Sequence, residues 1–222
     1  MRIGKWLAAV VVSSVVAVSP ASAGLVLDLN TGGSGQTCNV CGNNGTVFGW
    51  SFSLSGPVTI NGLGLWDNGA NGFGGKSYQT GLWSASGTLL ASVTVGDGST
   101  AVASASADGD WKFENISDLV LGTGRYVIGT LFFDFDPLAQ VGAPFTTIAE
   151  VSNVAGVQGA SNGGFQFAGN QFGFPIFGPT MRFVDKTTVP EPDGVALLAV
   201  ALAGAVLARR RTAARASGQT AA

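Results

Sequence analysis

Two pairs of aspartates in this sequence have a spacing that could carry acid–base chemistry. Asp134 and Asp136 would share one face of a strand, whereas Asp108 and Asp110 lie in a Gly-flanked loop. Two facing carboxylates can hydrolyse glycosidic bonds, one acting as acid and the other as base or nucleophile. Each pair lies at the end of an apolar run, where solvated acids protect strand edges. We therefore favour a structural role and assign no catalytic residue.

The absence of histidine among the 222 residues removes other chemistries. Ser-His-Asp and Cys-His catalysis, and zinc or non-haem iron sites built on His, are excluded. No Gly-rich segment ends in the Gly-Lys-Ser/Thr of a phosphate-binding loop.

The two cysteines, Cys38 and Cys41, form a CxxC motif. Such a motif can be half of a zinc site or a redox pair, but there is no second pair and no βαβ context. In an oxidising compartment the simpler interpretation is a small-loop disulfide, which we favour.

An oxygen-rich segment at 67–72, Asp-Asn-Gly-Ala-Asn-Gly, suggests a calcium loop with Asp67 and Asn71 as donors. The EF-hand pattern fails, because its third and twelfth positions hold Gly69 and Tyr78. A tight Asn/Gly turn is the favoured interpretation, and a calcium site of another type stays open.

Residues 163–177 are rich in Phe, Asn and Gln. Exposed aromatic rings stack on sugar rings while amides bond their hydroxyl groups, so this segment could be a carbohydrate-binding face. The alternative, which we favour, is a strand and loop whose Phe side chains fill the core.

These residues belong to a body, residues 24–188, whose apolar pattern is that of β-strands. In 47–54, for example, the side chains alternate between two faces. Gly-rich turns separate the runs and no long helical period occurs, so we expect an all-β fold, an antiparallel β-sandwich with jelly-roll topology. Strands are expected at 47–54, 58–66, 78–83, 88–95, 111–116, 125–133, 145–151, 164–167 and 180–184.

The N-terminal 23 residues have the three parts of a signal peptide. Arg2 and Lys5 precede an apolar region of 13 residues, 6–18, which is too short to span a bilayer comfortably. Ala21 and Ala23 form the small-x-small cleavage site, so we expect a mature chain that begins at Gly24. A permanent N-terminal anchor is the less favoured alternative.

The C-terminal region reads as a membrane anchor. Residues 194–208 are 15 apolar or small residues without a charge, and Arg209, Arg210 and Arg211 follow. This order is typical of a stop-transfer helix with its arginines in the cytoplasm, where residues 212–222 would form a short tail. A buried amphipathic helix is disfavoured because the segment has no polar face.

Pro190, Glu191 and Pro192, followed by this apolar segment and the Arg cluster, resemble the PEP-CTERM sorting tail over residues 189–211. The resemblance implies an exported protein of a Gram-negative bacterium, processed by an exosortase and associated with exopolysaccharide and biofilm. The segments 63–67, 81–91, 124–129 and 175–184 resemble a β-sandwich module frequent in such proteins, to which no activity is assigned.

Between the two ends, residues 24–188 carry eleven acidic and five basic side chains, a net charge of −6. Such a body repels a phosphate backbone, so nucleic acid is not an expected partner. We expect a non-catalytic protein of the cell envelope or extracellular matrix, with no cofactor. Its expected partners are an exosortase, exopolysaccharide, and the membrane through 194–208. The alternatives are a polysaccharide-acting enzyme using Asp or Glu, and a calcium-dependent carbohydrate-binding module.

Overall fold

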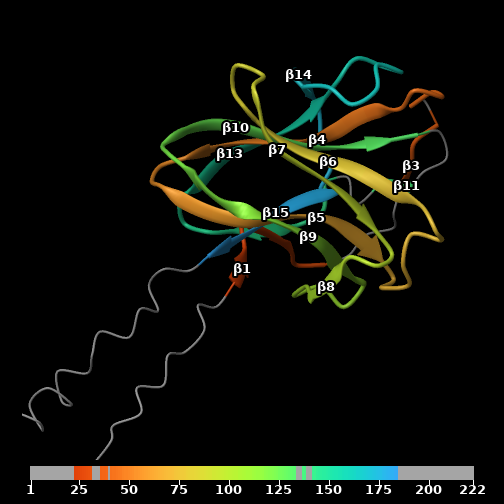
Figure 1. Ribbon diagram of the computed structural model, residues 1–222, viewed down its shortest axis with the longest axis horizontal. Helices are drawn as coiled ribbons and strands as arrows, with labels where there is room; N and C mark the ends of the chain where they lie inside the picture. The colour runs from red at the N-terminus through yellow and green to blue at the C-terminus, as the bar shows by residue number, and fades with distance from the viewer. Residues whose placement is uncertain (1–22, 32–35, 40, 134–136, 139–141, 185–222) are drawn as a thin grey trace, which may run out of the picture. The chain divides into compact units, whose positions relative to one another are not determined.

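The alternating apolar runs pair into two antiparallel sheets. A computed structural model describes residues 23–31, 36–39, 41–133, 137–138 and 142–184 (Figure 1). The five-stranded sheet has the order β1 (Ala23–Leu25), β15 (Pro179–Val184), β5 (Val58–Asn68), β9 (Gly109–Leu121) and β8 (Thr100–Ala103). The six-stranded sheet has the order β14 (Asn170–Phe172), β13 (Val151–Gln158), β4 (Thr46–Leu54), β10 (Gly124–Phe132), β6 (Ser77–Ser84) and β7 (Leu89–Gly96).

Two further antiparallel pairs are short: β2 (Leu27–Leu29) with β12 (Phe145–Thr147), and β3 (Gln36–Thr37) with β11 (Pro137–Leu138). The described residues contain strands and no helix, and every strand pairing is antiparallel. The expected all-β class and antiparallel pairing are therefore confirmed, whereas the jelly-roll winding stays a prediction.

The two sheets lie one above the other and share one core (Figure 1). Each sheet contributes the inward side chains of its alternating strands. On the six-stranded sheet these include Trp50, Phe52, Leu82 and Ile128, and on the five-stranded sheet Ile60, Leu63 and Met181. Trp66, Trp111 and Phe113 of the same apolar cluster lie on the other face of the five-stranded sheet. Burial of such surface is the main favourable term in folding.

Trp50 joins the two sheets directly. Its side chain is fully buried, and its indole Nε1 donates a hydrogen bond of 2.7 Å to the backbone oxygen of Pro179, the first residue of β15. One residue of the six-stranded sheet therefore holds the strand that ends the described domain.

Several differences from the expected strands have local causes. Residues 164–167 are not a strand: Gly164 has a φ of +72°, and Phe165 and Phe167 pack on Trp83 instead. The run at 145–151 divides into β12 and the longer β13, and β9 is longer than expected. The hairpin of 78–83 and 88–95 is confirmed as β6 and β7.

The first and last described strands are neighbours. Ala23 of β1 lies opposite Val184 of β15. Gly24, the expected mature N-terminus, is the second residue of this short strand. The folded domain therefore begins and ends at the same edge of the five-stranded sheet.

Several predicted features lie outside the described residues. They are the leader with Ala21, the sorting motif Pro190–Pro192, the apolar segment 194–208, Arg209–Arg211, the tail 212–222 and the pair Asp134/Asp136. Within the described part of the chain, no helix has the length and apolar character needed to cross a membrane.

Substitution of Trp50 by Phe tests the link between the sheets. The variant removes a buried donor and leaves the Pro179 oxygen without it, so the free energy of unfolding should fall by about 2–4 kcal/mol. Urea denaturation measures this change. Val120→Ala, on a side chain that is 62% exposed, should change it by less than about 0.5 kcal/mol. Equal small effects of both variants would contradict the assignment.

Candidate functional site

The strands β5 and β9 bring together two aspartates that the sequence does not suggest as a pair. Asp67 and Asp110 lie opposite each other, and Lys112 Nζ is 3.6 Å from an Oδ2 atom of each. Asp67 is only 1% exposed, and burial raises the pKa of Asp110. Asp108 instead accepts a hydrogen bond from Ser106 Oγ. The two acids of the possible Asp108/Asp110 pair therefore have different partners.

The oxygen atoms of Asp67 that could bind a calcium ion already have other partners. Its Oδ2 accepts a 2.8 Å hydrogen bond from the backbone N–H of Gly72 and faces the Lys112 ammonium. Its backbone oxygen accepts from Ala70 N–H at 3.2 Å. Over the described residues, no cluster of three or more His, Cys, Asp or Glu side chains is arranged to hold a metal. This geometry supports the tight Asn/Gly turn for 67–72.

The neighbouring loop is organised by Asp97, which the sequence analysis did not single out. Its carboxylate accepts hydrogen bonds from the backbone N–H groups of Phe73 and Gly75. These bonds favour the ionised form and hold the pKa of Asp97 below its ordinary value of 3.8. The donor residues lie 22–24 positions away in the chain, so no local sequence motif predicts the contact.

The two cysteines form the expected disulfide, with Cα atoms 5.7 Å apart. Both are buried, in a second apolar cluster with Phe48, Tyr78 and Phe132. Thr46 Oγ1 donates to the Cys41 oxygen at 3.0 Å. A buried disulfide packed in this way has a structural role, because exchange with another thiol requires access to the sulfur.

The aromatic segment 163–177 covers part of the outer face of the six-stranded sheet. Phe165 and Phe167 contact Trp83, with ring centroids 5.2 and 6.5 Å apart respectively. Gly81 permits this contact, since a Cβ there would lie 2.6 Å from the Trp83 ring and 2.7 Å from Phe165. The third apolar cluster, on this face, also includes Val47, Val127, Leu131, Val157 and Ala168.

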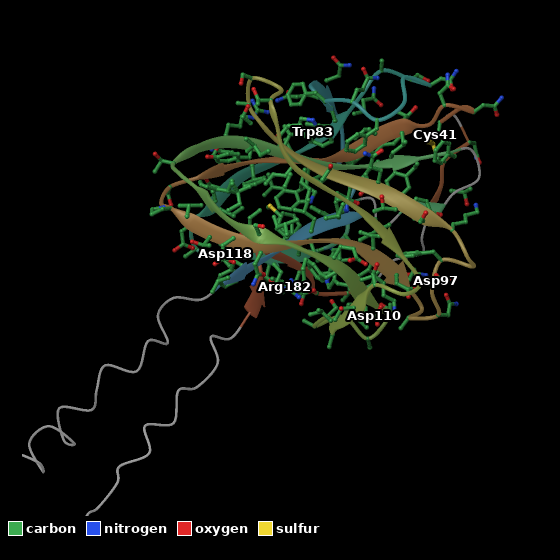
Figure 2. The ribbon with its side chains drawn as sticks, in the orientation of Figure 1. Cys41, Trp83, Asp97, Asp110, Asp118 and Arg182 are labelled. Atoms are coloured by element: carbon green, nitrogen blue, oxygen red, sulfur yellow. A yellow bond between two sulfur atoms is a disulfide. The ribbon has the colours of Figure 1, made fainter. Side chains whose placement is uncertain are left out.

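These aromatic side chains therefore mainly pack, but Phe165 and Phe167 do so on the outer face of the sheet, whereas the favoured interpretation placed them in the core. Phe177 is fully buried in the main core, whereas Phe174 is 62% exposed. In Figure 2, Trp83 lies on the six-stranded layer, and Arg182 and Asp118 lie on the other layer.

Beside this aromatic cluster, the outer face is hollowed around Arg125, a residue that sequence reasoning missed. Two hollows of about 280 and 380 Å³ both include Arg125 and Gln171 in their walls. We call this surface the Arg125 groove. The other residues that define it are Ala85, Val127, Val157, Phe167, Ala168 and Gly169 in the smaller hollow, and Ser53, Asn153, Val154 and Ala155 in the larger.

Comparison with known proteins identifies the C-terminal region. The family model of the PEP-CTERM protein-sorting motif matches residues 188–211. This match confirms the sorting tail that the sequence analysis placed at 189–211. No curated protein and no solved structure gives a significant match to the chain. The resemblance of the body to a β-sandwich module therefore stays a prediction.

Replacement of Asp97 by Asn should weaken the fold in a pH-dependent way. Because the folded-state pKa lies below 3.8, the carboxylate stabilises the fold above that pH and loses this effect as pH falls. Urea midpoints of the wild type should therefore exceed those of Asp97→Asn at pH 6, and the difference should shrink below pH 3.8. Asp118→Asn, at an exposed position on β9, is the control. A difference that does not depend on pH would contradict the assigned role.

Proposed function

Because this chain carries the PEP-CTERM sorting motif, and so is an exported protein sorted by an exosortase-type system, we propose that it is a non-catalytic component of the cell envelope or extracellular matrix. Its proposed role is contact with exopolysaccharide in the matrix of a biofilm. The match at residues 188–211 is the observation that carries the proposal.

The position of the motif supports presentation of a folded domain outside the cell. The match begins at residue 188, and the last described strand, β15, ends at Val184. The expected leader ends at Ala23, which lies opposite Val184. Removal of the leader and of the tail would thus both act at one edge of the domain and leave its core strands untouched.

The two ends then have complementary roles in the proposal. The leader 1–23 directs export and is cleaved after Ala23. Residues 194–208 hold the protein in the membrane of a Gram-negative cell, with Arg209–Arg211 on the cytoplasmic side. A span of 15 residues is short for a bilayer core of about 30 Å, which suits an anchor that is later removed.

The chemistry of the described domain supports a role without catalysis. The two acids that come together, Asp67 and Asp110, share Lys112 in an ion-paired cluster. The disulfide is buried, and the sequence has no His. A glycosidase would instead require two carboxylates that flank a bound sugar.

The sorting step is tested by changing the motif itself. In the native host, the double variant Pro190→Ala, Pro192→Ala should accumulate in the membrane fraction, with the released form reduced at least about tenfold, because the processing enzyme no longer recognises the tail. Asp193→Ala changes the adjacent residue and should leave release close to that of the wild type. Quantitative immunoblots of both fractions measure the ratio. Normal release of the double variant would refute sorting through this motif.

A further inference from the structure

Arg125 differs from Lys112 and Arg182, two other positive side chains of the described domain. Lys112 is paired with two aspartates, and Arg182 donates to Asn61 and Asn115 and lies over the ring of Phe113. Arg125 is exposed, and within the described part of the chain its guanidinium has no carboxylate at ion-pair distance. On an acidic domain, it is therefore a local positive site that no described acid neutralises.

The guanidinium is nevertheless held in place. Arg125 Nη2 donates a 3.0 Å hydrogen bond to Ser51 Oγ, a hydroxyl that is completely buried on the neighbouring strand β4. Ser51 Oγ in turn lies 3.5 Å from the oxygen of Ala155 on β13. A guanidinium carries five N–H donors, so this single bond orients the side chain and leaves donors for a ligand.

The backbone around Arg125 departs from a regular ladder. Between Ser152 and Ala155, the pairing of β13 with β4 shifts at a bulge, and Asn153 has a φ of +53°. Its amide Nδ2 lies 3.4 Å from Ser53 Oγ, in the wall of the larger hollow. Bulges often redirect a side chain in this way, and here an amide comes to lie beside the arginine.

The smaller hollow has a different wall. Phe167 and Val157 supply apolar surface, and Gln171 of β14 supplies an amide that is shared with the larger hollow. The groove therefore combines one cation, two amides and a partly buried aromatic ring. The aromatic ring matches the apolar C–H face of a saccharide ring, and the amides match its hydroxyl edges.

We propose that the Arg125 groove binds a carboxylate-bearing sugar, with the carboxylate on Arg125 and the ring and its neighbour in the two hollows. Arginine matches a carboxylate with two parallel hydrogen bonds, which fixes orientation as well as affinity. Each hollow, at about 280 and 380 Å³, has the size of the smallest ligand pockets, about 300 Å³. The proposal rests on the proposed function for the saccharide, and it adds that the saccharide is acidic.

The charge of the domain limits which anions fit. A net charge of −6 over residues 24–188 repels densely charged polymers, whereas one carboxylate per disaccharide faces mainly Arg125. Binding should therefore weaken with added salt. A free carboxylate without a sugar ring would lack the contacts in the hollows.

Calorimetry on the purified full-length protein tests the assignment with matched probes. Cellobiouronic acid, a disaccharide with one carboxylate, should bind at least about tenfold more tightly than uncharged cellobiose, and acetate should not compete at the same concentration. Arg125→Lys keeps the charge but not the paired geometry, and should weaken binding of the acid about tenfold. Arg125→Met should abolish the preference for the acid over cellobiose.

Arg182→Lys, the same conservative change on the other sheet, is the matched control and should leave binding unchanged. Thermal melts verify that each variant is folded. Equal binding of both disaccharides, competition by acetate, absence of binding, or an unchanged preference in Arg125→Met would each overturn the proposal. Absence of binding, together with the expected loss of release in the Pro190→Ala, Pro192→Ala variant, would refute the groove alone. Binding as expected, together with normal release of that double variant, would refute only the proposed function.

Discussion

The contact between the two sheets is the constraint on which the rest of this domain depends. Trp50 is central to it, because the residue both fills the core and bonds the oxygen of Pro179. That bond holds the start of β15, and β15 in turn pairs with β5 and with β1. The position from which the sorting tail continues is therefore determined by packing in the middle of the protein.

The strands β4 and β10 contribute side chains both to the shared core and to the outer face of the six-stranded sheet. Their inward side chains, Trp50, Phe52 and Ile128, build the shared core. Their outward positions carry Val47 and Val127 beneath the aromatic segment and, further along, Ser51 and Arg125. Because side chains alternate strictly along a strand, a shift of register by one residue would place Arg125 in the core and Ile128 outside it. The register that stabilises the fold also creates the groove.

The fold was largely predictable where the signal is local. The alternation in 47–54 and the small-residue turn at 84–87 predict β4 and the β6–β7 hairpin correctly. The prediction of a strand at 164–167 was wrong, since Phe165 and Phe167 pack on Trp83, a residue about 80 positions away, and composition cannot distinguish the two uses of a phenylalanine. The sorting tail was predictable because its three parts are consecutive.

The candidate site was less predictable for a related reason. Arg125, Asn153 and Gln171 meet only through the pairing of β10, β4, β13 and β14. Likewise, Asp67 and Asp110 become neighbours only through the register of β5 with β9. A single arginine among strand residues has no recognisable sequence motif. Whether it lines a groove depends on residues of other strands, which are distant in the sequence.

In the proposed function, the exported domain is cleaved from both its N-terminal leader and its C-terminal sorting tail. The most direct measurement is the intact mass of the protein from its native host, determined separately for the membrane and released fractions. The account predicts a released form that begins at Gly24 and ends near Pro190. A released form that still contains Arg209–Arg211 and the residues to Ala222 would contradict it.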